Sequence, residues 1–210
     1  MHILVLFAHP RRESFTGAVL DSLLEGLGEH RGHTIEIADL YREDFESRLQ
    51  PEDYAQFRGE TMPEEVRREQ ARFDRCDAVA FVFPVWWWSF PAVLKGWIDR
   101  VFCEGWAYTF EPGISRGRLK DRPTLVLGVA GSRETTYRKY GYGEAMRVQI
   151  DVGILGYCGL RDVETHILFD VEQNPETRRS YLSEAREIGR SFLSPDRHRR
   201  VPELGSDRPA

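Results

Sequence analysis

The sequence predicts a doubly wound α/β domain with a five-stranded parallel sheet. Five short apolar runs alternate with stretches whose apolar residues recur at helical spacing. The run from Ala78 to Phe83 is apolar throughout, as expected of a strand buried on both faces. Because strands and helices alternate strictly, a parallel sheet is favoured, and the strand order 2-1-3-4-5 would place a crevice between strands one and three.

A strand–helix–strand unit is expected to open the chain. Ile3 to Phe7 predicts a buried strand, and a helix follows from about Ser14. The buried stripe of this helix consists of leucines: Leu20, Leu23, Leu24 and Leu27. Thr34 to Ala38 predicts the second strand. Residues 39–59 show no rhythm and stay unassigned, whereas 63–75 predicts a charged helix that leads into the central strand.

The central strand is expected to end at Pro84, which has no N–H to donate to a neighbouring strand. Three tryptophans follow, and then Ser89 and Pro91 predict a helix start, with the Ser89 hydroxyl as its cap. Apolar residues at helical spacing mark the buried face of this helix: Leu94, Trp97, Ile98, Val101 and Phe102. The helix has more apolar surface than one sheet face needs, so we expect part of it to form a dimer interface.

The rest of the chain continues the same alternation. Residues 103–122 predict a loop or short hairpin, and 124–130 predict the fourth strand. A stretch rich in Tyr and Gly, 135–143, is expected to cover the end of that strand. A helix at 144–158 and a fifth strand at 163–169 then complete the sheet.

A last helix is predicted to start at Asn174-Pro175, with Asn174 as its cap. The inner face of this helix is apolar and aromatic: Tyr181, Ala185, Ile188 and Phe192. Beyond it the sequence is rich in Pro, Arg and Asp and has no periodicity. We therefore expect one domain over residues 1–193 and a disordered tail over 194–210.

Composition argues against several classes of protein. The net charge is −5 and the charges are interleaved, which argues against a nucleic-acid surface. Three cysteines, Cys76, Cys103 and Cys158, lie far apart and indicate neither a disulfide framework nor a metal site. No stretch reads as a secretory signal or a membrane span. We expect a cytoplasmic protein without membrane insertion.

Trp86, Trp87 and Trp88 are either core residues or the wall of a ligand site. Successive side chains of an extended segment point to opposite sides, so three adjacent indoles cannot share one core. At least one is therefore expected to line a cleft or an interface. A flat apolar wall suits a flat aromatic ligand.

The loop after the first strand suits a phosphate. It holds His9, two arginines, Ser14 and Thr16 just before a helix, and a helix N-terminus binds anions through its free N–H groups. The sequence contains no P-loop, no GxGxxG fingerprint and no GxSxG elbow. A site of aromatic rings, backbone amides and a phosphate cradle supplies binding and orientation, so the chemistry would belong to a cofactor. A flat ring with a phosphate tail describes a flavin.

Two stretches resemble the NAD(P)H:quinone oxidoreductases of the DT-diaphorase type. One is 84–102 together with Gly105-Trp106-Ala107-Tyr108-Thr109-Phe110, and the other is Ala8-His9-Pro10 with Ser14-Phe15. The resemblance extends over residues 1–193. It implies a flavodoxin-like fold and a homodimer with one flavin per subunit, usually FAD and in some bacterial members FMN.

The resemblance also implies roles for individual residues. The flavin contacts would be His9, Ser14, Phe15, Thr16, Pro84, Val85, Trp86, Trp87, Gly131, Ser132 and Tyr137. Tyr137 matches a tyrosine implicated in the hydride step. Trp87 and Trp88 would form the substrate wall, and Tyr108 and Phe110 would cover it from the second subunit.

The implied reaction is a ping-pong transfer of two electrons. NAD(P)H passes hydride to the flavin and leaves, and a quinone or similar flat oxidant then takes the same place. The family often has Thr-Thr-Gly-Gly where this chain has Val129-Ala130-Gly131-Ser132, and 140–144 contains no histidine as a proton partner. Tyr142, Tyr140 or water could take that role.

Other functions use the same fold. An azo- or nitroreductase has the same flavin site, and some relatives are flavin-binding regulatory subunits that contact a potassium-efflux transporter in the membrane. A small electron carrier is a third alternative. The aromatic loop 106–110 argues against it, because a carrier needs an exposed flavin edge.

Overall fold

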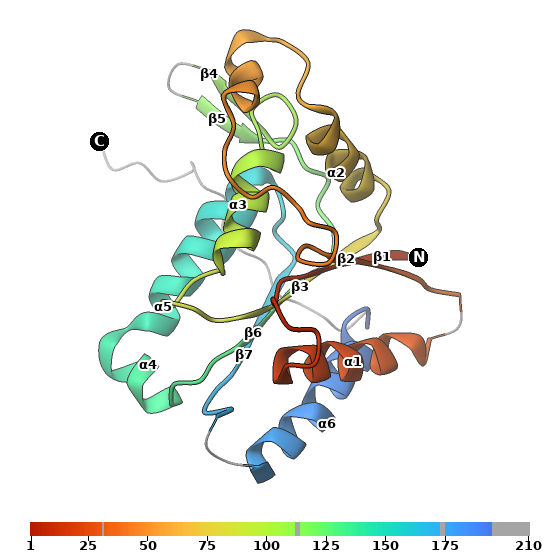
Figure 1. Ribbon diagram of the computed structural model, residues 1–210, viewed down its shortest axis with the longest axis vertical. Coiled ribbons are helices and arrows are strands. Elements are labelled where there is room, and N and C mark those ends of the chain that lie inside the picture. The colour runs from red at the N-terminus through yellow and green to blue at the C-terminus, as the bar shows by residue number, and fades with distance from the viewer. Residues whose placement is uncertain (31, 112–113, 173–174, 195–210) are drawn as a thin grey trace.

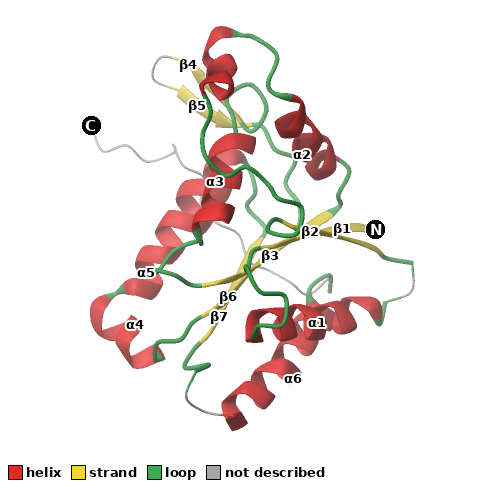
Figure 2. Cartoon of the chain, in the orientation of Figure 1, coloured by secondary structure: helices red, strands yellow, loops and turns green. Residues whose placement is uncertain are grey.

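The computed structural model describes residues 1–30, 32–111, 114–172 and 175–194. These residues form one parallel sheet at the centre, with the order β2-β1-β3-β6-β7 (Figures 1 and 2). Its strands are β1 (His2–Phe7), β2 (Thr34–Asp39), β3 (Ala78–Pro84), β6 (Thr124–Val129) and β7 (Val163–Leu168). The predicted fold class and the order 2-1-3-4-5 are confirmed. The chain reverses its direction of winding between β1 and β3, so a crevice opens at the carboxyl ends of these strands.

Helices cover both faces of this sheet. They are α1 (Phe15–Gly28), α2 (Glu64–Asp74), α3 (Ala92–Val101), α4 (Glu134–Tyr140), α5 (Tyr142–Arg147) and α6 (Pro175–Ser191). The unassigned stretch contains a 3₁₀ helix, η1 (Pro51–Arg58), and α5 runs into a π-helix, η2 (Val148–Gly156). The predicted hairpin is present as β4 (Tyr108–Glu111) and β5 (Ile114–Gly117).

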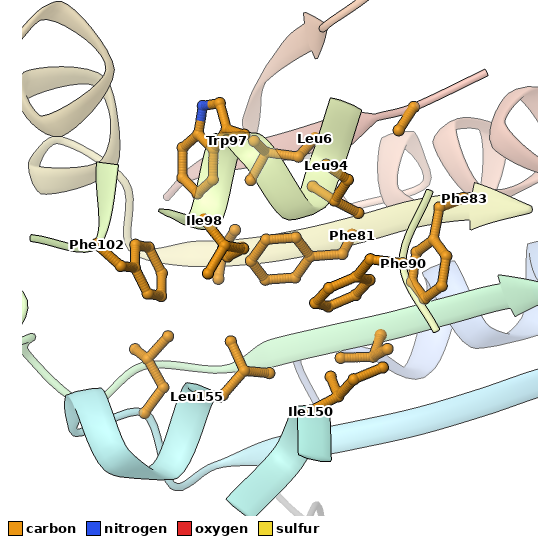
Figure 3. Packing of buried hydrophobic residues seen from close by; sticks show 14 of the residues in the cluster. Leu6, Phe81, Phe83, Phe90, Leu94, Trp97, Ile98, Phe102, Ile150 and Leu155 are labelled. Carbon is orange, nitrogen blue, oxygen red and sulfur yellow. The ribbon is translucent and has the colours of Figure 1, made fainter. Parts of the chain in front are cut away.

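The sheet separates two apolar cores. Helices α1 and α6 cover one face, and α2, α3 and η2 cover the other (Figure 1). Strand β3 supplies both cores in alternation, since Phe81 and Phe83 enter the α3 side and Ala80 and Val82 the α1 side. Figure 3 shows the α3 side, where side chains from α3 and η2 meet those of β3. This two-sided burial explains why β3 is apolar throughout.

Glycines allow helices α1 and α6 to touch. A Cβ on Gly26 of α1 would lie 2.0 Å from the carbonyl oxygen of Arg186 in α6. A Cβ on Gly189 would lie 2.3 Å from the carbonyl oxygen of Leu23. Each glycine therefore lets its helix approach the backbone of the other. This close packing fixes the N-terminus of α1 relative to that of α6.

One predicted helix cap is wrong, and a stretch without a predicted element is helical. Helix α3 has Pro91 at its N-cap without a side-chain cap, and the Ser89 hydroxyl instead donates to Gln149 Oε1 at 2.7 Å. The stretch 135–143 is mostly helical: α4 ends at Tyr140, its C-cap Gly141 has a left-handed φ of 71°, and α5 starts at Tyr142. Asn174 and the tail beyond Ser194 lie outside the described residues. No helix in the described part of the chain is long and apolar enough to cross a membrane.

Candidate functional site

A cleft of about 550 Å³ lies at the carboxyl ends of the central strands. Its lining joins the loops that follow β1, β3 and β6: His9, Arg11, Glu13, Ser14, Phe15, Thr16, Pro84, Val85, Trp86, Val129 and Gly131. The loop after β7 adds Val171 and Glu172, and the start of α6 adds Arg178. Most of the residues expected to bind the cofactor therefore share one cleft. Trp87, Ser132 and Tyr137 are not in its lining.

The N-terminus of α1 forms one end of this cleft. Ser14 is its N-cap, and its hydroxyl accepts a hydrogen bond from Gly17 N at 3.1 Å. Phe15 and Thr16 form the first turn, whose N–H groups and positive dipole end favour an anion. The first helical turn is therefore suited to hold a phosphate.

The polar residues of the first loop have different roles. Arg11 lines the cleft, whereas Arg12 is bound to the carboxylate of Asp21 and faces α1. His9 Nδ1 accepts a hydrogen bond from Arg11 N at 3.0 Å, which leaves the proton of the neutral ring on Nε2. Burial lowers the pKa of His9, so the ring is neutral at pH 7 and can still donate from Nε2. Of the two arginines, only Arg11 is placed to meet an anion.

Sequence reasoning missed the contribution of α6 to the cleft. The Arg178 guanidinium lies 4.7 Å from the centre of the Phe15 ring, and Arg178 lines the cleft together with Arg11. Glu172 lies beside Gly131, where an added Cβ would come within 2.9 Å of its carboxylate. Glu172 follows β7 at the edge of the sheet, whereas Arg178 belongs to α6, which packs on α1. The sequence predicted the start of the last helix, but it did not indicate against which part of the fold this helix packs.

The three tryptophans lie in a tight turn. Ser89 N donates to the carbonyl oxygen of Trp86 at 3.1 Å, and φ is 52° at Trp87 and 55° at Trp88. Positive φ at both central positions is the pattern of a type I′ turn, which favours Asn and Gly. For other L-residues this backbone costs about 1–2 kcal/mol at each position. Such strain is concentrated at functional sites in proteins.

The turn gives each indole a different environment. Trp86 is 42% exposed and lines the cleft with its ring 6.2 Å from that of His9. Trp87 is 86% exposed. Trp88 is half-buried against the core and stacks on Tyr142 with a centroid distance of 3.9 Å. The expectation that at least one indole lines a cleft agrees with this arrangement, and only Trp88 is partly a core residue.

Tyr137 is buried in the core on the α3 side of the sheet. Its ring packs edge-on against Phe169 at 4.8 Å and Tyr142 at 6.2 Å. Burial raises the pKa of Tyr137 to about 12, so its hydroxyl keeps its proton at any physiological pH. It can donate a hydrogen bond but cannot serve as a base. Ser132 is exposed, and its carbonyl oxygen accepts from Asp170 N at 3.1 Å.

The comparisons with known proteins agree with this geometry. The model of the flavodoxin-like fold matches residues 1–191. A solved NAD(P)H:quinone oxidoreductase from Methanothermobacter marburgensis is 40% identical, with a TM-score of 0.85 over 91% of this chain and 98% of that chain. The chain belongs to the flavodoxin-like NAD(P)H:quinone oxidoreductase family.

Two further flavodoxin-like relatives have similar lengths. An uncharacterized NAD(P)H oxidoreductase of Haemophilus influenzae is 29% identical over 88% of this chain and 91% of its own. The ribosyldihydronicotinamide dehydrogenase [quinone] of Rattus norvegicus is 29% identical over 86% of both chains. The family match over residues 1–191 includes all three loops of the cleft.

The residues of this flavodoxin-like cleft fit a flavin. A helix N-terminus and Arg11 offer an anion site at one end, and Pro84, Val85 and Trp86 offer an apolar wall at the other. The chemistry of this donor set is suited to a molecule with a phosphate tail and a flat ring.

Tyr108 and Phe110 lie elsewhere in the flavodoxin-like chain. They belong to β4, beyond the C-terminal end of α3, whereas the tryptophan turn precedes its N-terminal end (Figure 1). Tyr108 lines a second, more apolar groove of about 440 Å³ with η1, α3 and η2, and its ring lies 5.3 Å from that of Tyr157. Phe110 is 63% exposed. Within one chain, these two aromatics do not reach the cleft.

Proposed function

We propose that this protein is a flavin-dependent NAD(P)H:quinone oxidoreductase that transfers two electrons from NAD(P)H to a quinone or a similar flat oxidant. The observation that supports this most directly is the single cleft that joins the N-terminus of α1 to the tryptophan turn. Membership of the family supports the same activity. NAD(P)H is a cytoplasmic reductant, so we also propose a cytoplasmic location.

The cofactor-binding residues follow from the two ends of the cleft. The first turn of α1, with Ser14, Phe15 and Thr16, would hold phosphate, and His9 would add a donor from Nε2. Pro84, Val85, Trp86 and Trp87 would meet the ring from the β3 side, and Gly131 and Ser132 from the β6 side. N–H groups at such a position stabilise negative charge on a bound ring.

We propose FAD as the cofactor, with FMN as the alternative. Arg11 and Arg178 come from different elements and both line the cleft. One phosphate at the helix N-terminus needs only one of these cations, whereas a diphosphate can use both. The second arginine is therefore the feature that favours a dinucleotide.

When bound, the flavin supplies the hydride chemistry, because none of the side chains in the cleft can accept and return an electron pair. The chain itself supplies placement. Trp87 and Trp88 would offer NAD(P)H and the quinone, in turn, the same apolar stacking surface, which excludes water and aligns each molecule for transfer. Tyr137, protonated at working pH, would donate a hydrogen bond close to the ring.

A homodimer would complete the site. The lining of the second groove is mostly apolar and aromatic and includes the exposed Tyr54 and Phe57, and Phe110 of β4 is exposed as well. A patch of this kind suits a protein partner. A second copy that packs there could place its Tyr108 and Phe110 over the cleft, which they cannot reach within one chain.

The visible spectrum of the purified protein tests this function. We expect a bound yellow flavin that bleaches with NADPH under anaerobic conditions and recovers when menadione is added. Chromatography of the released cofactor then distinguishes FAD from FMN. A colourless protein that takes up neither flavin would overturn the proposal.

The same cleft serves the alternative functions, so rates must separate them. A higher kcat/KM for azo dyes or nitroaromatics than for any quinone would favour an azo- or nitroreductase. Association with a membrane potassium-efflux partner, together with slow quinone turnover, would favour a regulatory subunit.

A further inference from the structure

One helical segment contacts two successive residues of the tryptophan turn. The Tyr142 ring stacks on the Trp88 ring at a centroid distance of 3.9 Å and an interplanar angle of 28°. Gln149 Oε1 accepts a hydrogen bond from the Ser89 hydroxyl at 2.7 Å. Tyr142 is the first residue of α5, and Gln149 is the second residue of η2.

The spacing of these two residues explains how one segment reaches both. Seven positions are close to two helical turns, so Tyr142 and Gln149 lie on the same face of the segment. The loop between β3 and α3 runs alongside α5 (Figure 1). The continuous helical backbone of 142–149 therefore makes a rigid support for the turn.

The turn needs such a support. Trp87 and Trp88 both have the positive φ that L-residues disfavour, and neither is Asn or Gly. A backbone of this kind persists only when surrounding contacts determine it. Trp87 itself is almost fully exposed, and its ring contacts that of Trp88 at 5.9 Å and 72°. The position of Trp87 thus depends on that of Trp88.

We propose that Tyr142 is a positioning residue for the substrate wall and acts through the face of its ring on Trp88, with Gln149 as a second support through Ser89. The consequence for substrate binding rests on the proposed function. The placement of the turn does not, because it follows from contacts within the chain. The ring of Tyr142, rather than its hydroxyl, is the functional part.

The test compares three variants of the full-length protein labelled with 5-fluorotryptophan. Tyr142→Leu removes the stacked ring, and Tyr142→Phe keeps the ring and removes the hydroxyl. Tyr41→Leu is the matched control, since it makes the same change at an exposed tyrosine in the loop after β2. The ¹⁹F spectrum holds five tryptophan resonances, assigned by single Trp→Phe changes. The fully buried Trp97 reports whether each variant is folded.

We expect Tyr142→Leu to shift or broaden the Trp87 and Trp88 resonances and to leave that of Trp97 in place. The KM for quinone should rise about fivefold, the effect of losing one aromatic pair, with kcat changed less than twofold. Tyr142→Phe and Tyr41→Leu should match the wild type in the ¹⁹F spectrum and in the KM for quinone.

A double-mutant cycle with Ser89→Ala and Gln149→Ala tests the hydrogen bond between these two residues as the second support of the turn. Either change should broaden the same two resonances, and the double variant should add little, because both remove one hydrogen bond. Gln149→Glu keeps an acceptor and should restore the wild-type spectrum.

Unchanged Trp87 and Trp88 resonances in folded Tyr142→Leu would overturn the inference, as would equal damage from Tyr142→Phe. The spectrum is recorded without added flavin as well as with it. A protein that binds no flavin would therefore overturn the proposed function and leave the result on the turn standing.

Discussion

Ser14 has two roles that opposite substitutions can separate. Its hydroxyl caps α1 through Gly17 N, and Ser14 lines the cleft, where we propose that it helps to hold the cofactor phosphate. Ser14→Ala removes the cap, which lowers the free energy of unfolding by about 1 kcal/mol. In a domain of this size that corresponds to a fall in Tm of roughly 2–4 °C. Flavin binding should weaken only modestly, because the backbone N–H groups remain.

Ser14→Asp should have the reverse pattern. Aspartate is an equally good N-cap and favours the positive end of the helix dipole, so Tm should equal or exceed that of the wild type. A carboxylate beside a phosphate, however, is repelled by about 1–4 kcal/mol near a protein surface, which raises the Kd for flavin at least about fivefold. Ser183→Asp adds the same charge to an exposed position of α6 and is the matched control.

Two measurements check this pair: thermal unfolding by circular dichroism, and flavin titration followed by quenching of flavin fluorescence. If Ser14→Asp binds flavin as tightly as the wild type, the phosphate does not lie at the N-terminus of α1. If Ser14→Ala loses no stability, the hydroxyl is not the effective cap. Each result contradicts a different step of the reasoning.

Three further predictions concern stability and assembly. The side chains of Arg100 and Asp53 are 1% and 0% exposed and form an ion pair at 2.8 Å. Asp53→Ala should therefore lower the free energy of unfolding, measured in urea, by roughly 3 kcal/mol. The control Glu134→Ala removes an exposed ion pair and should lower it by less than about 0.5 kcal/mol. Burial raises the pKa of Asp151 to about 6. Between about pH 4 and 6 the carboxyl is therefore protonated in the folded state and ionised in the unfolded state, so the free energy of unfolding falls as the pH rises through that window. Asp151→Asn should flatten this dependence and add roughly 1–3 kcal/mol at pH 7; equal slopes would contradict the assignment. Phe110→Glu should lower the sedimentation coefficient from dimer to monomer, and an unchanged value would show that β4 is not in the interface.

The sequence was sufficient to predict the sheet because the signals that specify it are local. Phe81 and Phe83 alternate with Ala80 and Val82, and all four are buried, so hydrophobicity alone marks β3 as central. The helix N-terminus in the cleft was predictable for a similar reason, since Ser14 sits next to the helix that it caps. Capping and strand burial depend on near neighbours in the sequence.

The missed features depend on tertiary contacts. Arg178 reaches the cleft only because α6 packs against α1, which no local pattern of the sequence indicates. Ser89 has the chemistry of a helix cap, but its hydroxyl bonds to Gln149, 60 positions away, and Pro91 occupies the N-cap position. The π-helix that carries Gln149 has no recognised sequence signal either.

The separation of the three indoles was predicted correctly, but the backbone geometry that separates them was not. The alternation of side chains along an extended segment predicts that the indoles cannot share a core, and they do not. The actual separation comes from two positive φ angles at Trp87 and Trp88, in a turn type that normally has Asn or Gly. Local preference alone would reject this turn at these residues. In the proposed role of Tyr142 and Gln149, their contacts compensate for the strain of this turn. The most distinctive part of the candidate site is therefore also the part that the local sequence predicts least well.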